Sequence, residues 1–228
     1  MPVYININWI YFCIVFGAML LISFIKNLQS ASFYSMYVVI RKFSIIDLEF
    51  PASGLELVTF IKGIFLLPVE LSKKSLRALR GQLYLDFLFM PALYGSIFLL
   101  CMKVSLKMSS FGHGLFAVLA WLQCIAWVCD ITENIYLLNK IRPEPVISKP
   151  AVHIAYEILE ICKWGIALMA AVCSFAAIFY LWLVGRYSYH SIQYLLIISA
   201  EIIVFFIAKK ITGKSEKEKL EKFQQAGS

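Results

Sequence analysis

Five long runs of apolar residues divide the chain, and more polar segments separate them. The runs cover 5–25, 84–106, 114–139, 160–184 and 191–208. About 20 apolar residues in a helix cross the ~30 Å hydrocarbon core of a bilayer, because each residue adds ~1.5 Å. A helix also satisfies its own backbone polar groups, as a membrane requires. The pattern therefore predicts an all-α, polytopic membrane helical bundle with five transmembrane helices.

The first run lacks the features of a cleaved secretory signal. No basic residue precedes its apolar core, and residues 23–26 offer no cleavage site flanked by small side chains. We therefore expect residues 5–25 to remain in the protein as the first transmembrane helix.

The segment 30–82, between the first two runs, has a different pattern. Residues 54–67 fit a short amphipathic helix, and 31–50 could lie at the membrane interface or form a re-entrant segment. After Pro68, basic residues alternate with leucines at helical spacing, which predicts a helix lying in the headgroup region. The basic residues are Lys73, Lys74, Arg77 and Arg80, and the leucines are Leu71, Leu76, Leu79 and Leu83. A solvated helix face is the alternative.

The composition supports a membrane protein, and the positions of its charges predict its orientation. The chain is 61% hydrophobic and 15% charged, whereas average soluble domains are ~45–50% apolar and ~25% charged. Eighteen of the 21 lysines and arginines fall in 26–82, in 140–163 or after residue 208. Because basic residues concentrate on the cytoplasmic side of membrane proteins, the N-terminus should lie outside and the C-terminus in the cytoplasm. We divide the chain into a bundle, 1–208, and a charged cytoplasmic tail, 209–228.

The net charge of +7 needs no nucleic-acid partner. A nucleic-acid-binding protein would show a soluble basic domain or an aromatic platform, and the sequence has neither. Anionic headgroups on the cytoplasmic side explain the charge. Membrane lipids are therefore the expected partners, and another subunit or a second copy of the chain could also bind.

Acidic residues inside the apolar runs are the strongest indication of function. A charge at membrane depth costs at least ~2.5–3.5 kcal/mol, so such residues are rare and usually functional. Alternation of the five helices puts all of these acids in the cytoplasmic half of the bundle. They are Asp86, Asp130, Glu133, Glu160 and Glu201.

Four of these acids form the candidate centre. Asp130, Glu133 and Asp86 are the candidate catalytic residues, acting as general acids or bases. Together with Glu160 they are the candidate ligands of a divalent cation such as Mg²⁺ or Mn²⁺, which prefers oxygen ligands. We expect the carboxyls of Asp86 and Asp130 to approach each other or share a partner, because helices joined by a short loop pack together.

Candidate substrate-binding residues lie beside this centre. Asn134 and Trp127 extend the helix face that carries Asp130. The basic side chains on the segment after Pro68 are candidates for binding lipid headgroups. These are Lys73, Lys74, Arg77 and Arg80.

Each acid also has a structural explanation. Asp86 could pair with Arg80, and Glu133 could pair with Lys163 across the bundle. Asp130 could hold neighbouring helices together through hydrogen bonds. The shared depth of the acids favours a functional cluster over these separate explanations.

Three classes of function agree with the sequence. The first is an enzyme that processes a lipid or an isoprenoid at the cytoplasmic leaflet, with a divalent cation or a carboxyl as the acid–base group. The second is a non-catalytic assembly or partner protein whose acids dock another subunit. The third is a cation or proton transporter, which is less favoured because the outer half of the bundle has no second acidic station. The sequence contains no nucleotide-binding loop, HExxH motif or nucleophile elbow.

Overall fold

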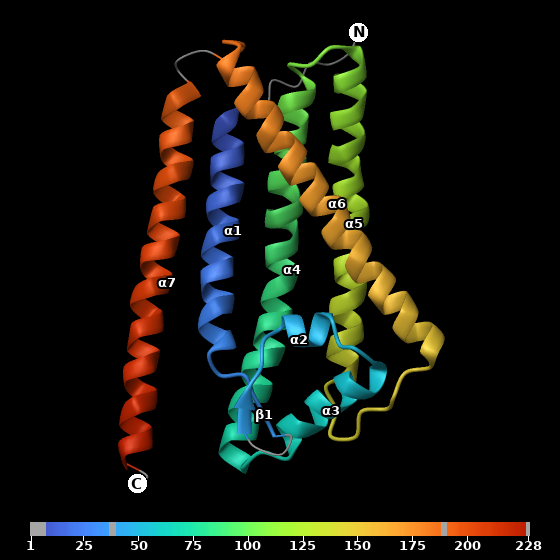
Figure 1. Ribbon diagram of the computed structural model, residues 1–228, viewed down its shortest axis with the longest axis vertical. Coiled ribbons are helices and arrows are strands. Elements are labelled where there is room, and N and C mark those ends of the chain that lie inside the picture. Colours follow the sequence, from blue (N-terminus) through green and yellow to red (C-terminus); the bar gives the residue numbers. More distant parts are fainter. Residues whose placement is uncertain (1–7, 37–39, 188–190, 227–228) are drawn as a thin grey trace.

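The computed structural model describes residues 8–36, 40–187 and 191–226. Five long helices alternate in direction along the bundle, and the fourth of them crosses the others obliquely (Figure 1). They are α1 (Trp9–Ser30), α4 (Val69–Ser105), α5 (Ser110–Lys140), α6 (Pro150–Leu183) and α7 (Ile192–Ala226). The central helix is α4, which contacts α1, α5 and α6, while α7 packs beside α1 at the edge. The predicted all-α bundle is confirmed.

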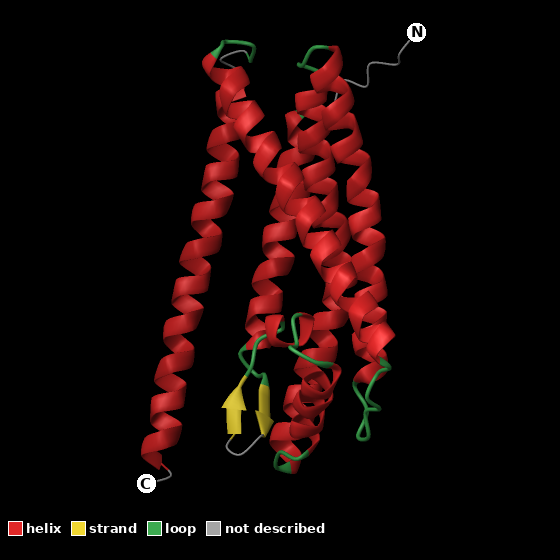
Figure 2. Cartoon of the chain, turned by 45° about the vertical axis from the view of Figure 1, so that its right-hand side comes forward, coloured by secondary structure: helices red, strands yellow, loops and turns green. Residues whose placement is uncertain are grey.

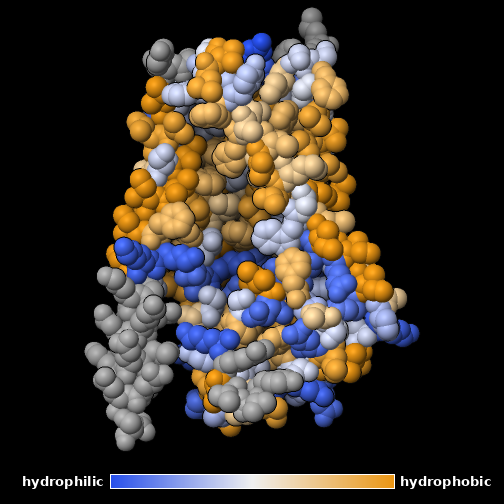
Figure 3. All heavy atoms as spheres, in the orientation of Figure 1, coloured by the Kyte–Doolittle hydropathy of each residue, from blue (hydrophilic) through white to orange (hydrophobic). Residues whose placement is uncertain are grey.

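Four of the described helices, α1, α4, α5 and α6, are long and apolar enough to cross a membrane. The predicted number of five is therefore one too many by this measure. The fifth long helix, α7, is not among these four. It contains Glu201 and continues from its apolar part through the charged tail to Ala226. The apolar surface covers most of the length of the bundle, and hydrophilic residues gather at one end (Figure 3).

The residues between α1 and α4 form a small layer at that hydrophilic end. Two short antiparallel strands, β1 (Tyr34–Met36) and β2 (Ile40–Lys42), make a hairpin, drawn in yellow in Figure 2. A four-residue helix, α2 (Ile46–Glu49), and a longer one, α3 (Gly54–Phe65), follow it. Their apolar side chains pack against the ends of α4 and α5.

The short amphipathic helix expected at 54–67 is α3. Ser53 caps its N-terminus, because the Ser53 hydroxyl accepts a hydrogen bond from the backbone N–H of Glu56 at 3.1 Å. The Glu56 carboxylate in turn accepts a bond from the backbone N–H of Ala52 at 2.6 Å. This reciprocal arrangement satisfies donors that the first turn of a helix leaves free.

The prediction of a separate interfacial helix after Pro68 is wrong. The basic stretch is the first part of α4, which continues without interruption for 37 residues. Such a helix is about 55 Å long at ~1.5 Å per residue, well above the ~30 Å of hydrocarbon. Its buried face is more polar than the leucine pattern suggested, because Ser72 and Ser75 are buried with Leu79, and the Ser75 hydroxyl donates to the Ser32 carbonyl at 2.9 Å.

Small side chains bring α6 close to α4 and α5. Ala167, Ala170 and Ser174 are buried on one face of α6, and the Ser174 hydroxyl lies 3.1 Å from the Cys101 sulfur of α4. Small residues allow helix backbones to approach closely in a membrane, where van der Waals contact is a principal source of association. This packing fixes the position of Glu157 and Glu160, which lie nearer the N-terminus of α6.

Gly63→Ala should destabilise the layer formed by the hairpin and α3. An added Cβ would lie 2.5 Å from the backbone oxygen of Met36 and would also overlap the Ser35 side chain. Overpacking of this kind costs about 1–3 kcal/mol. Thermal unfolding in detergent measures the change. The control is Gly165→Ala, an exposed position in α6 with no atom within 4 Å of the added Cβ, which should keep or raise stability because alanine favours a helix. Equal stability of Gly63→Ala and the parent would contradict the close packing.

Candidate functional site

A buried lysine surrounded by carboxylates lies between α5 and α6. Lys163 on α6 is 4% exposed and forms a hydrogen-bonded ion pair with Glu133 of α5. Its ammonium nitrogen also lies 3.2 Å from a carboxylate oxygen of Asp130 and 3.1 Å from one of Glu160. Asp130 and Glu133 are three residues apart, as are Glu160 and Lys163, so each pair lies on one face of its helix. The two helices present these faces to each other.

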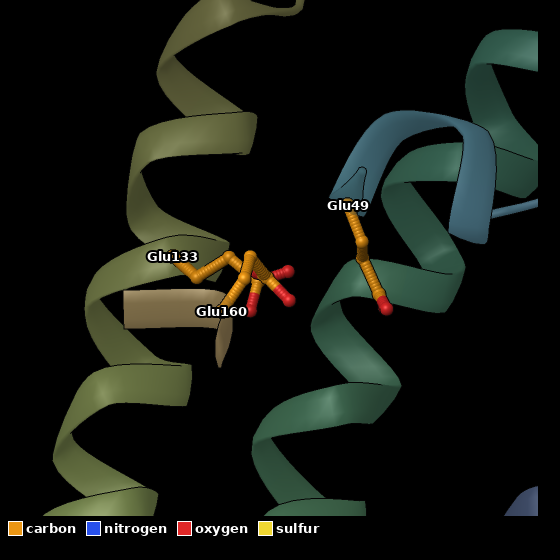
Figure 4. A group of neighbouring side chains, drawn as sticks. All are labelled: Glu49, Glu133 and Glu160. Atoms are coloured by element: carbon orange, nitrogen blue, oxygen red, sulfur yellow. The ribbon is translucent and has the colours of Figure 1, made fainter. Parts of the chain in front are cut away.

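A further carboxyl reaches the cluster from outside the long helices. Glu49 is the last residue of α2, and its carboxyl approaches those of Glu133 and Glu160 (Figure 4). One oxygen from each of these three glutamates lies within 4.8 Å of the others. The position of α2 depends on Tyr156 of α6, whose hydroxyl donates to the backbone carbonyl of Leu48 at 3.0 Å.

Two of the glutamates in this group have unused hydrogen-bonding capacity. Glu160 is 0% exposed, and neither of its carboxyl oxygens has a hydrogen-bond partner among the described residues. Its 3.1 Å approach to Lys163 is an ion pair without hydrogen-bond geometry. One oxygen of Glu49 is also buried without a partner, and burial raises the pKa of Glu49 above its ordinary value of 4.5. Buried polar atoms usually have partners, so these oxygens need an explanation.

A second ion pair lies close to the cluster. Lys26 of α1 donates to Asp86 of α4 and also lies over the ring of Phe89, with 4.5 Å from its nitrogen to the ring centre. In the part of the chain that the structure describes, two lysines therefore face five acidic residues in this region. These acids are Glu49, Asp86, Asp130, Glu133 and Glu160. Carboxylates brought together at low dielectric cannot all remain ionised without further cations or protons.

The four acids that the sequence predicts as one centre pair with two different lysines in the structure. Asp130, Glu133 and Glu160 meet at Lys163, whereas Asp86 belongs to Lys26. Asp86 and Asp130 share no hydrogen-bond partner among the described residues. The group with a geometry suited to a metal contains Glu49 in place of Asp86 and Asp130.

The structural pairings expected from the sequence have mixed outcomes. Glu133 does pair with Lys163 across the bundle. Arg80 does not pair with Asp86, because its guanidinium donates to the backbone carbonyl of Ile141 at 3.2 Å, beyond the end of α5. Glu201 lies apart from the cluster, since its carboxyl faces Gly17 of α1.

The candidate substrate residues occupy different surroundings. Asn134 is buried and donates to the backbone carbonyl of Leu83 at 3.3 Å, so it connects α5 to α4. Trp127 lines a cavity between the same helices. The basic residues Lys73, Lys74 and Arg77 line a groove of about 440 Å³ beside the end of α1.

Three participants were not selected from the sequence. Lys26 ends an apolar run and counted only as a basic residue for the orientation. Glu49 lies in the segment between the first two apolar runs, two residues after Asp47, where acids are ordinary, so nothing local distinguishes it. Tyr94 donates to the second oxygen of Asp130 at 2.9 Å, and its spacing of eight residues from Asp86 on α4 could have indicated a shared helix face.

Comparisons with known proteins add no identification: no protein-family model, no curated protein and no solved structure matches the chain. Functional conclusions therefore depend on the site itself.

Lys163→Met should lower stability much more than Asp130→Asn. Removing the lysine leaves three buried carboxylates without their cation, and breaking a buried ion pair in this way costs about 3–5 kcal/mol. In Asp130→Asn the lysine keeps Glu133 and Glu160, and the amide oxygen can still accept from Tyr94. Thermal unfolding in detergent compares the two variants.

Lys73→Met, a change of the same kind at an exposed position of α4, is the matched control. If Lys163→Met unfolded at the same temperature as this control, the carboxyls around Lys163 would have to be neutral. A large loss in Asp130→Asn would instead make Asp130 part of the scaffold.

Proposed function

We propose that this protein is a membrane-embedded enzyme that processes a lipid or an isoprenoid at its carboxylate cluster. Glu49, Glu133 and Glu160 would hold a divalent cation, Mg²⁺ or Mn²⁺. The observation that supports this most is the completely buried Glu160 carboxyl. Among the described residues it has Lys163 as an ion-pair partner but no partner with hydrogen-bond geometry, and one of its oxygens lies within 4.8 Å of two other glutamate oxygens. Divalent Mg²⁺ and Mn²⁺ prefer such oxygen ligands.

The donor set fits a hard divalent cation better than a second ammonium group. Three carboxyls contact Lys163 and Glu49 lies beside two of them, so one positive charge faces up to four negative charges. A divalent cation would reduce this excess more than a single ammonium group, and the carboxyl oxygens without hydrogen-bond partners could bind it directly. When bound, it would supply Lewis-acid stabilisation of an oxygen that develops negative charge.

The residues around the cation site have separate roles in this proposal. Asp130 accepts from Tyr94 and contacts Lys163, so it can hold or release a proton beside the bundle cavity as the general acid–base. Lys163 keeps Asp130 and Glu133 in position. The basic residues at the N-terminal end of α4 would attract an anionic headgroup. They are Lys73, Lys74 and Arg77.

We also propose that α7 crosses the membrane beside the four apolar helices, that the hydrophilic end of the bundle is cytoplasmic and that the N-terminus lies outside. The strands β1 and β2, the helices α2 and α3, the 141–149 connection and the C-terminal end of α7 all lie at this end (Figure 1). Most basic residues belong to these segments or to those next to them in the sequence. In a background without the native cysteines, a cysteine replacing exposed Lys74 should react with an impermeant maleimide from the cytoplasmic side. Reaction from the opposite side alone would reverse the orientation.

The cation site predicts a specific loss of metal binding. Titration of the purified protein with Mn²⁺, followed by electron paramagnetic resonance, should show a site that weakens by about tenfold or more in Glu160→Gln and in Glu49→Gln. Glu157→Gln is the matched control, because Glu157 lies on the same helix but pairs with His153 and is half exposed. Binding should strengthen as the pH rises, since Glu49 must lose its proton to become a ligand. Equal binding by parent and Glu160→Gln would reject the site.

The enzymatic part of the proposal needs a separate measurement. Proteoliposomes made from native membrane lipids with Mg²⁺ should consume at least one lipid species, detected by mass spectrometry. Asp130→Asn should lower this turnover by about 10² or more if Asp130 is the acid–base group, while Glu157→Gln should keep it. Unchanged lipids with the parent protein, combined with intact Mn²⁺ binding, would leave a non-catalytic partner function in its place.

A further inference from the structure

A second feature of the bundle, distinct from the glutamates, is a cavity between α4 and α5. Its volume is about 260 Å³, and its walls are largely aromatic. Phe98 and Trp121 form one wall, with their rings edge to face and 5.5 Å between centres. Pro91, Tyr94, Gln123 and Trp127 are among the other lining residues. Trp121 and Trp127 are also exposed on the outside of the bundle, where the hydrocarbon of a membrane would lie.

One polar group in this apolar lining has an unmet requirement. Gln123 is 1% exposed, and its amide nitrogen donates to the backbone carbonyl of Leu119 at 3.1 Å. Its amide oxygen has no partner among the described residues. An acceptor left unsatisfied in an apolar site is costly. The oxygen is covered by its neighbours, so a ligand that brings an O–H group removes this cost once the amide turns toward the cavity.

The cavity is also connected to the carboxylate cluster. Tyr94 is both a lining residue and the donor to Asp130, at 2.9 Å. The other oxygen of Asp130 lies 3.2 Å from the nitrogen of Lys163, which contacts Glu133 and Glu160. Because the Tyr94 hydroxyl donates its hydrogen to Asp130, its oxygen can still accept from a bound hydroxyl.

We propose that this cavity binds a lipid alcohol, meaning an acyl or isoprenoid chain with a free hydroxyl. The aromatic walls suit the chain, the exposed tryptophans mark an entrance from the bilayer, and Gln123 and Tyr94 offer acceptors for the hydroxyl. This inference deepens the proposed function by naming the substrate class. The binding step itself needs neither a metal nor catalysis.

Quenching of tryptophan fluorescence tests the assignment. One protein keeps Trp127 as its only tryptophan, with the other four replaced by phenylalanine. In phosphatidylcholine nanodiscs without divalent cations, it is titrated with a long-chain alcohol brominated close to its hydroxyl and with the methyl ether of the same alcohol. The alcohol should quench Trp127 at an about three- to tenfold lower mole fraction than the ether, because only the alcohol can donate to Gln123 or Tyr94.

Two controls separate the site from general partitioning into the bilayer. A protein that keeps only Trp164, which is exposed on α6, should be quenched equally by both compounds. Gln123→Leu in the Trp127 protein should reduce or remove the preference for the alcohol. If the leucine variant does not fold, Gln123→Met is used in its place, because methionine keeps the length of the side chain.

The outcomes distinguish this inference from the proposed function. Equal quenching of Trp127 by both compounds would overturn the alcohol site and would mean that water alone satisfies Gln123. A full preference that survives in both Gln123 variants and in Tyr94→Phe would also overturn it. Glu160→Gln should leave the quenching unchanged, so a lost preference with intact Mn²⁺ binding rejects the cavity and not the cation site. A lost Mn²⁺ site with the preference retained rejects the cation site and not the cavity.

Discussion

Burial of the Lys163 ammonium among carboxylates is the constraint on which the arrangement of the bundle depends. An unpaired charge is too costly in a dry interior, so α5 and α6 must meet where Asp130 and Glu133 face Lys163. Apolar side chains alone would permit several registers between two helices, because lipid and leucine are almost equally apolar. The ion pairs remove that freedom. The small residues of α6 then allow the close packing that the charges require.

The same constraint explains why the site is suited to chemistry. Lys163 contacts three carboxyls but carries one positive charge, and Glu160 has no hydrogen-bond partner among the described residues. A scaffold built only for stability would place one carboxyl against each ammonium, or use apolar residues of similar volume. The surplus of carboxyls is better explained by a group that arrives and leaves, such as a proton or a divalent cation.

Much of the fold follows from hydrophobic periodicity, and much of the site does not. Long apolar runs determine the helices, and the depth of Asp130, Glu133 and Glu160 follows from helix alternation. The basic pattern after Pro68 could not settle the direction of its helix, because the same spacing of lysines and leucines suits a helix in the membrane plane or one standing upright. Glu49 could not be selected, since a tertiary contact between Tyr156 and Leu48 brings it to the site.

The position of Glu49 has a consequence for the order in which the protein assembles. Glu133 and Glu160 enter with the helices that carry them, but Glu49 belongs to a four-residue helix whose position depends on the hairpin, α3 and the Tyr156 contact. That layer reaches its full packing only against α4, α5 and α6 together, because its core includes residues from all three. The three-glutamate group is therefore complete only once this layer has packed. A chain inserted in the membrane with this layer unfolded would hold two of the three carboxyls and remain incomplete until folding ends.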